Sequence, residues 1–288
     1  MTLETANDSP LLTSYDERWK KYRTQYKACR KEFSGEAVHD LRVTARRMLA
    51  MLDIARGLVP HPRVQKARKE LKAIIDQLDE LRDVQVLLVE ISENIELLPE
   101  LKSFQKALTK REARLFRSAY KHVKQNGLSE LSKRIKKTRE HLVEMEEQDA
   151  GFQTRLLEVV DNAHASAEQA SAQVDSAQPS TIHNLRIMFK KFRYLVEIVH
   201  PYIEKYPTEN FERMHHYQDV MCNIQDSEVF LTSFMEYTEE HAPDLKKDNV
   251  IVSYQNKLQA LIEDFMNIRP QLHSFWKKNQ AAEKEKNK

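Results

Sequence analysis

The sequence has little glycine, little cysteine and no long apolar run. Only four of its 288 residues are glycine and alternating β-branched residues are scarce, which argues against β-sheet and predicts an all-α fold. Cys29 and Cys222 are too few and too far apart for a disulfide framework or a short metal-binding motif. No apolar stretch reaches about 18 residues, and the N-terminus does not resemble a signal peptide. We therefore expect a cytoplasmic protein with no membrane partner.

Net charge is nearly absent as well. The chain carries 46 Lys plus Arg against 44 Asp plus Glu, a formal net charge of +2, so strong anion binding must depend on how the charges are arranged. The glycine-rich motifs of P-loop and dinucleotide-binding proteins are missing. A Glu-x-x-His segment occurs at 212–215, but di-iron helix bundles need two such motifs together with further carboxylates that face inward. The sequence therefore predicts no metal site and no cofactor.

Prolines divide the chain into pieces of helical length, because proline interrupts the interior of a helix. The expected helices are 12–33, 36–58, 63–94, 99–126, 128–149, 152–176, 180–200, 208–238, 246–268 and 271–284. The expected organisation is a disordered N-terminus at 1–11, a first helical-bundle repeat at 12–148, a second at 152–275, and a frayed charged tail at 276–288.

One basic helical pattern occurs twice, 144 residues apart. Val-His-Asp-Leu-Arg-Val at 38–43 recurs as Ile-His-Asn-Leu-Arg-Ile at 182–187. At about 100° per residue, three basic side chains share one face of each helix and apolar residues share the other. The basic residues are His39, Arg42 and Arg46 in the first copy, and His183, Arg186 and Lys190 in the second. Because the cations are retained together with the apolar stripe, the duplication indicates anion binding and not packing alone.

A second segment is duplicated with a nearly equal offset. Leu-Arg-Asp-Val at 81–84 resembles Ile-Gln-Asp-Ser at 224–227, which is 143 residues later and indicates two related halves. We expect the repeated carboxylates, Asp83 and Asp226, to be structural. Each would be a buried or capping carboxylate that fixes a bend, or one that orients an arginine of the basic helix. We do not expect them to be ligands.

These residues resemble the conserved histidine α-helical domain (CHAD) family, in which two repeats each carry a His-x-x-Arg-x-x-x-Arg/Lys helix. Residues 183–197 follow the family pattern through an Arg-Tyr pair and a Glu, residues 39–47 are similar, and Arg82-Asp83 resembles the family's Arg-Asp pair. The departures are Leu49 where the second copy has Arg193, Gln225 where the first has Arg82, and a missing glycine before the Arg-Asp pair. The resemblance covers about residues 12–275, as in a stand-alone member with no separate catalytic domain.

The resemblance implies two four-helix bundles related by a pseudo-twofold axis, with a basic central cleft that binds inorganic polyphosphate. The residues support this chemistry, because arginine can hold phosphate oxygens with two donors, lysine adds a compact charge, and histidine gains a donor on protonation. His39 and His183 are also expected in the first helical turn, where free backbone N–H groups favour anions. Each basic helix is expected to bury its apolar stripe in its own bundle, so that the two cationic faces can oppose each other across a channel.

The predicted polyphosphate-binding residues form two groups. The principal contacts are His39, Arg42, Arg46, Arg47, His183, Arg186, Lys190, Lys191 and Arg193, supported by Lys20, Arg23 and Lys27 on the preceding helix. The second-tier candidates are Lys69 and Lys72, the residues at the corresponding positions 144 residues later, Arg213 and His216, and Tyr194. A third basic face, between Lys106 and Lys121, has no repeat and is expected to be solvated.

Two alternatives use the same cations. An RNA-binding protein would show aromatic stacking platforms among its basic residues, whereas Phe189 and Phe192 are expected to face inward. A phosphohydrolase acting on polyphosphate or triphosphate would need carboxylates that hold a divalent metal, and only Asp40 lies beside these faces. The favoured prediction is a non-enzymatic polyphosphate-binding protein, with nucleic acid the less favoured partner. Whether it also joins polyphosphate granules and their associated proteins stays open.

Overall fold

The computed structural model describes residues 9–125 and 127–277, in which every regular element is helical. Within these ranges the α-helices are α1 (Pro10–Lys31), α2 (Gly35–Leu58), α3 (Pro62–Asn94), α4 (Leu101–Gln125), α5 (Ser129–Gln148), α6 (Phe152–Ala172), α7 (Pro179–Val199), α8 (Glu209–His241) and α9 (Asp248–Ile268). Two short 3₁₀ helices, η1 (His200–Tyr202) and η2 (Arg269–Ser274), follow α7 and α9. The predicted all-α class is confirmed for these residues.

Side-chain caps and prolines set several helix starts. The Ser34 hydroxyl accepts a hydrogen bond from the Ala37 N–H at 3.1 Å, which satisfies one of the unpaired donors at the start of α2. Helices α1, α3 and α7 begin with proline, whose missing N–H is not needed at the first helical position. These signals are local, and the predicted starts of α1, α2, α3 and α7 therefore agree with the structure to within two residues.

Two predicted helical segments are wrong. Helix α6 ends at Ala172 instead of 176, because the Asp175 carboxylate accepts a hydrogen bond from the Ala177 N–H at 2.9 Å and forms a local turn. The expected helix 271–284 is instead the 3₁₀ helix η2, which contains Pro270 near its start, and residues 275–277 are not helical. The part of that prediction beyond residue 277 lies outside the described residues.

The expected limits of the two terminal segments also change. Helix α1 already includes Pro10 and the fully buried Leu11. At the other end, Trp276 is only 6% exposed, and its indole N–H donates to the Asp161 carboxylate at 2.6 Å. Residues 9–11 and 275–277 therefore belong to the folded body, while 1–8 and 278–288 lie outside the described residues.

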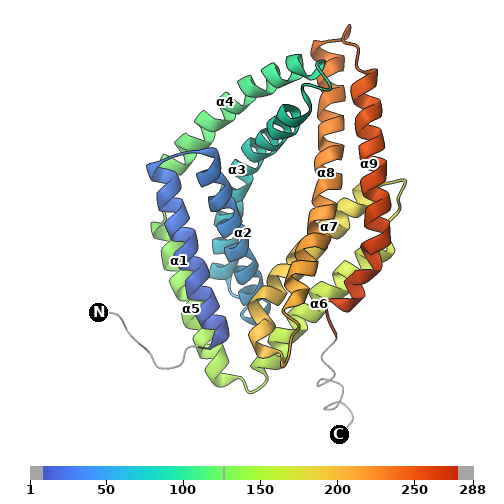
Figure 1. Cartoon of the computed structure of the whole chain (residues 1–288). Helices are drawn as coiled ribbons and strands as arrows, with labels where there is room; N and C mark the ends of the chain where they lie inside the picture. The colour runs from blue at the N-terminus through green and yellow to red at the C-terminus, as the bar shows by residue number, and fades with distance from the viewer. Residues whose placement is uncertain (1–8, 126, 278–288) are drawn as a thin grey trace.

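The two halves of the chain lie side by side. Figure 1 shows α1–α5 on one side and α6–α9 on the other, with α2 and α7 facing the middle. The first half has five helices, one more than a four-helix repeat, with only residues 126–128 between α4 and α5. Helices α2 and α7 are in contact, so the duplicated basic helices meet at the boundary between the halves.

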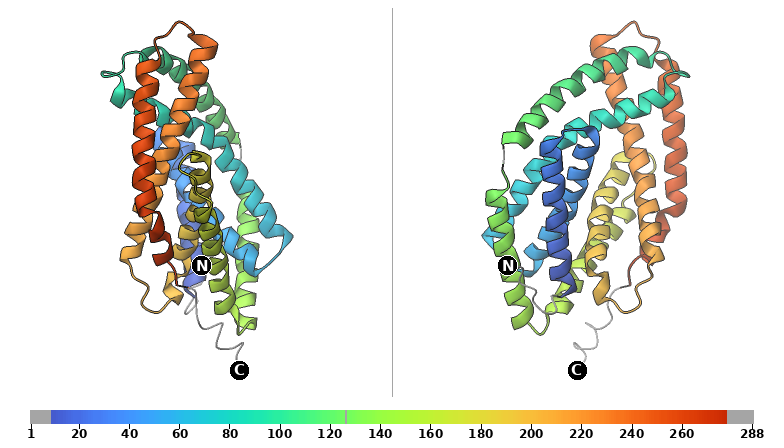
Figure 2. Two further views of the ribbon diagram at one scale, coloured as in Figure 1. Left: turned by 90° about the vertical axis from the view of Figure 1, so that its right-hand side faces the viewer. Right: turned by 60° about the vertical axis from the view of Figure 1, so that its left-hand side comes forward.

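The hydrophobic core is shared between the halves. One cluster includes buried residues from both, such as Met48 of α2 and Leu195 of α7. A second cluster joins α3 and α4 to α8 and α9, around Phe104 and Phe230. Both views in Figure 2 show the ribbons of α3 and α4 reaching the ends of α8 and α9 that meet at the loop between them. The apolar stripes of α2 and α7 thus belong to one connected core, although α2 packs mainly on α1 and α3, and α7 mainly on α6 and α8. No helix in the described ranges is long and apolar enough to span a bilayer.

Candidate functional site

The two duplicated basic helices, α2 and α7, direct their apolar faces into the core. The apolar side chains with no exposed surface include Leu41, Ala45 and Met48 on α2, and Leu185, Phe189 and Phe192 on α7. Because a helix that buries one stripe presents its opposite face elsewhere, the cations of both helices point away from this core. The same residue spacing thus fixes both the packing and the direction of the charges.

A cavity of about 450 Å³ lies between α2, α3, α7 and α8. Its titratable lining residues are His39, Arg42 and Arg46 from α2; Asp79, Arg82 and Asp83 from α3; His183, Arg186, Lys190 and Tyr194 from α7; and Asp226 from α8. Both duplicated basic faces border this one cavity. Four arginines, one lysine and three carboxylates line it, so it is less strongly positive than the basic helices alone predict.

Asp79 neutralises the cations of the first copy. Arg42 donates to the Asp79 carboxylate from Nε at 2.9 Å and from Nη2 at 2.6 Å, and Arg46 donates to both carboxylate oxygens at 3.0 Å. The Arg42 side chain is only 13% exposed, which reduces screening of this pair by salt. Nearby, burial and then the charge of Arg82 lower the pKa of His39, which favours its neutral ring. An external anion therefore competes with a carboxylate that is already bound.

The cations of the second copy have no such partner. Among the described residues no carboxylate lies within ion-pair distance of Arg186 or Lys190; Arg186 Nη1 instead lies 3.8 Å from the Cys222 sulfur, and its buried Nε has no hydrogen-bond partner. Burial lowers the pKa of Lys190 from its usual 10.5 to about 8, and repulsion from Arg46 and Arg186 adds to this effect. His183 Nδ1 is hydrogen-bonded to the Gln225 side-chain oxygen.

The expectation that Asp83 and Asp226 are buried or capping carboxylates is wrong. Both lie in the middle of long helices, α3 and α8, where no free backbone ends need caps, and both are exposed on the cavity wall. Desolvation by the surrounding protein still raises the pKa of each carboxyl. The positive charge of Arg42 opposes this effect at Asp83, and that of Arg186 opposes it at Asp226. No group of three or more His, Cys, Asp or Glu side chains in the described part of the chain is placed to hold a metal ion.

The position of the two histidines also differs from the prediction. His39 and His183 are each the fifth residue of their helix, beyond the free backbone N–H groups, and the Val38 N–H that precedes His39 already donates to the Ser34 carbonyl at 3.0 Å. The backbone at the start of α2 is moreover partly satisfied by the Ser34 cap. The side chains, and not the helix ends, therefore supply the positive charge of the cavity.

Comparison with known proteins agrees with this architecture. The model of the CHAD domain family matches residues 14–234, which is more than half of the chain. The chain belongs to the CHAD domain family. A crystal structure of the CHAD domain from the plant Ricinus communis superposes with a TM-score of 0.70 at 17% sequence identity, covering 93% of this chain and 92% of that chain. This likeness establishes the fold. The search of curated proteins found no match.

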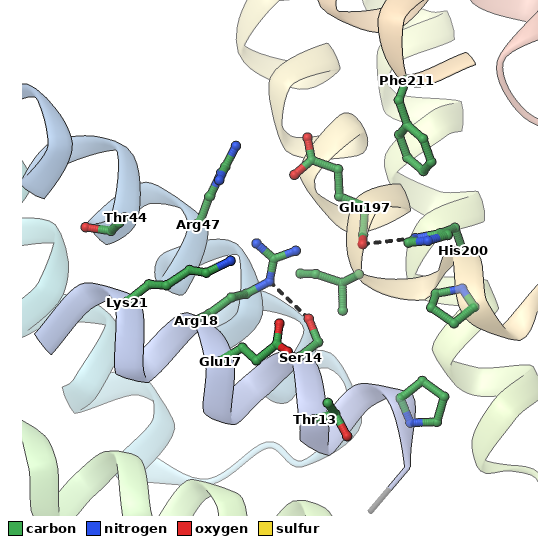
Figure 3. A pocket seen from close by; sticks show the side chains of 13 residues that line it. Thr13, Ser14, Glu17, Arg18, Lys21, Thr44, Arg47, Glu197, His200 and Phe211 are labelled. Carbon is green, nitrogen blue, oxygen red and sulfur yellow. Dashed lines mark hydrogen bonds between the residues drawn. The ribbon is translucent and has the colours of Figure 1, made fainter. Parts of the chain in front are cut away.

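Not all predicted contacts of this CHAD domain reach the cavity. Arg47 projects about 100° from Arg46 around α2 and lines a different cavity of about 690 Å³. Figure 3 shows it there with Arg18 and Lys21 of α1 and Glu197 of α7. Lys191 is exposed and lines neither cavity.

Arg193 is held inside the protein and does not line the central cavity. Its buried guanidinium donates from Nε to the side-chain amide oxygen of Gln218 at 3.1 Å and from Nη1 to the Glu197 carboxylate at 2.8 Å. A buried guanidinium with these partners stabilises the contact between α7 and α8 instead of presenting donors to a ligand. Tyr194, a second-tier candidate, does line the cavity.

The remaining predicted cations lie outside the cavity. Lys20, Arg23 and Lys27 are exposed, because α1 packs on α2 and contributes no residue to the cavity wall. None of the second-tier residues Lys69, Lys72, Arg213 and His216 lines it either. Lys72 pairs with Asp76 at 2.7 Å, and Arg213 donates to Asn210 and Ser274.

Sequence reasoning missed the contributions of α3 and α8. Asp79 was not considered, and Arg82 and Gln225 were noted only as parts of a motif, although all three line the cavity of this CHAD domain. The repeated segments at 81–84 and 224–227 were the available signal, because they place a polar face of α3 and of α8 at related positions. The pairing of Arg42 with Asp79 depends on how α2 packs against α3, which periodicity does not reveal.

Proposed function

We propose that this CHAD domain binds inorganic polyphosphate, without hydrolysing it, in the cavity between α2, α3, α7 and α8. The observation that carries the proposal is that both copies of the duplicated basic helix line the same cavity. Membership of the CHAD domain family supports it, since the family resemblance implies a basic cleft between two pseudo-symmetric halves.

The lining suits a linear phosphate polymer better than a single small anion. Arg42 and Arg46 reach the cavity from one half of the chain, and Arg186 and Lys190 from the other. Guanidinium groups hold phosphate oxygens with two parallel donors, and a polymer can contact several cations at once while releasing its counterions. Affinity should therefore fall steeply with salt. A reducing, cytoplasmic setting is part of the proposal, in keeping with two free cysteines.

The direct test is titration calorimetry with polyphosphate. Replacing Arg42, Arg46, Arg186 and Lys190 together with alanine should lower affinity at least about 100-fold, because each charge-assisted hydrogen bond contributes about 1.5–3 kcal/mol. The matched control replaces four predicted cations that do not line the cavity, Lys20, Arg23, Lys27 and Lys191, and changes the net charge equally. Equal losses in both variants would show that binding is a general charge effect and would remove this site.

The hydrolase alternative is tested separately. Asp79, Asp83 and Asp226 bring carboxylates to the cavity, which the basic helices alone did not predict. Incubation with polyphosphate or triphosphate should release no phosphate, with or without magnesium. Magnesium-dependent release that disappears in an Asp83→Asn, Asp226→Asn variant would replace binding by catalysis as the function.

One observation favours RNA as a second candidate ligand, at a different place. An open groove of about 800 Å³ between α4 and α8 is lined by Lys106, Lys110, Arg114 and Arg117 and by Tyr237 and His241, with no carboxylate among its lining residues. The Tyr237 and His241 rings stack at 5.7 Å with an 8° angle, which provides the aromatic surface that single-stranded RNA uses. RNA binding that survives the cavity variant but not alanine at the four groove cations would support this candidate.

A further inference from the structure

The two halves of the cavity differ at one duplicated position. Helix α8 repeats α3 with an offset of 143, and two side-chain contacts between residues four apart follow that offset. They are the Lys72–Asp76 ion pair at 2.7 Å and the His215–Asp219 hydrogen bond at 2.6 Å. In the same register Asp79 corresponds to Cys222. The second-tier prediction used an offset of 144 and therefore selected His216 instead of His215.

This difference changes the charge around each basic helix. In the first half, Asp79 binds Arg42 and Arg46 at 2.6–3.0 Å. In the second half, the equivalent side chain is not a carboxylate but the thiol of Cys222, which lies 3.8 Å from Arg186. The cations of the first half thus have an internal counter-ion, whereas those of the second half do not.

The second half also shows the signs of uncompensated positive charge. The buried Nε of Arg186 has no hydrogen-bond partner among the described residues. The two charges acting most strongly on Lys190 are Arg46 and Arg186, which both repel it, and together with burial they lower its pKa. Asp83 and Asp226 act on Arg186 through space without forming an ion pair with it. An incoming phosphate would relieve this repulsion.

We propose that Arg186 and Lys190 form the primary phosphate subsite of the cavity, and that Asp79 is a built-in competitor that keeps Arg42 and Arg46 from binding phosphate with full strength. The identity of the residue at position 79 and at its counterpart, 222, sets this asymmetry. The inference rests on the proposed function. It predicts that a short phosphate chain occupies the second half first, and that a longer chain recruits Arg42 and Arg46 by sharing them with Asp79.

Single replacements in the full chain test the order of the subsites, with tripolyphosphate as the probe. Arg186→Ala should lower affinity about tenfold or more, since it removes a charge-assisted contact. Arg42→Ala should lower it by less than about threefold, because Asp79 already offsets that charge. A larger loss for Arg42→Ala than for Arg186→Ala would overturn the inference, and so would equal losses.

Exchange of the duplicated residues gives the sharper test. Cys222→Asp supplies the missing counter-ion to Arg186 and should weaken tripolyphosphate binding about tenfold, whereas Cys222→Ser, the neutral control, should stay within about twofold of wild type. Asp79→Asn should strengthen binding. Circular dichroism melting of each variant checks that it is folded.

The outcomes separate the two proposals. If wild type binds neither tripolyphosphate nor long polyphosphate, the proposed function fails and the subsite assignment fails with it. If wild type binds but Cys222→Asp binds equally well, the cavity remains the site and only the assignment of its primary subsite is wrong.

Discussion

The pH dependence of polyphosphate binding follows from the environment of Lys190. Burial, with repulsion from Arg46, Arg186 and Arg42, lowers the pKa of Lys190 to about 8 in the free protein. The other group that acts on it, Cys222 of α8, favours the charged form. Lysine is charged below its pKa, so above pH 8 the free protein loses this cation. A bound phosphate stabilises the charged form and raises the pKa again, so binding takes up a proton between pH 8 and the usual value.

The size of the effect follows from proton linkage. In this window each pH unit should lower affinity by up to about tenfold, because one proton must be taken up for each phosphate chain bound. At pH 7 the lysine is almost fully charged and the dependence should vanish. The difference between pH 7 and pH 9.5 is therefore expected to approach, but not exceed, about 30-fold in affinity.

The assay is calorimetric titration of tripolyphosphate at pH 7, 8, 9 and 9.5 at constant ionic strength. The matched control is Lys190→Arg, which keeps the charge in this range and restores the residue type of the first copy, Arg46. A Cys222→Ser background removes any contribution of the thiol. Identical pH profiles for the lysine and arginine proteins would refute the reasoning, because the decline would then come from other groups.

Three further predictions concern stability, measured by urea unfolding at pH 7. Lys190→Met should stabilise the free protein by about 1–3 kcal/mol while weakening polyphosphate binding, because a charged amine with a lowered pKa destabilises the fold. The gain in stability should shrink as the pH rises from 8 towards 10.5, where the lysine is neutral in the folded protein. A loss of stability in this variant would contradict the account. Phe189→Ala should cost about 3–5 kcal/mol, since the ring is fully buried against Tyr217 and Phe275; a cost below about 1 kcal/mol would mean the shared core is not as described. Glu197→Ala should cost about 3 kcal/mol by leaving the buried Arg193 without its carboxylate, and Glu197→Gln should cost less; equal costs would argue against a role for the charge.

Local features of the sequence predicted the helices and the direction of the basic faces. Ser34 and the prolines at positions 10, 62 and 179 act within one turn, so the starts that they mark need no knowledge of the tertiary structure. The apolar stripe from Leu41 to Met48 likewise fixes where Arg42 points. The sequence predicts an α-helix where the 3₁₀ helix Arg269–Ser274 lies, because a proline at the start of a segment is compatible with either type of helix.

The partners of the cations could not be predicted in the same way. Periodicity places Lys20, Arg23 and Lys27 on one face of α1, but it does not say that this face turns away from the cavity. Asp79 is 37 residues from Arg42 in sequence, and the two meet only because α2 and α3 pack together. For the same reason the sequence predicted a strongly basic cleft, whereas the cavity contains carboxylates from α3 and α8.

The most direct test of the central claim is a crystal structure of the protein with tripolyphosphate. The account predicts phosphate density in the cavity between α2 and α7, with oxygens at hydrogen-bond distance from Arg186 and Lys190. Density confined to the groove along α4, or to the exposed cations of α1, with the cavity between the duplicated helices unchanged, would contradict it.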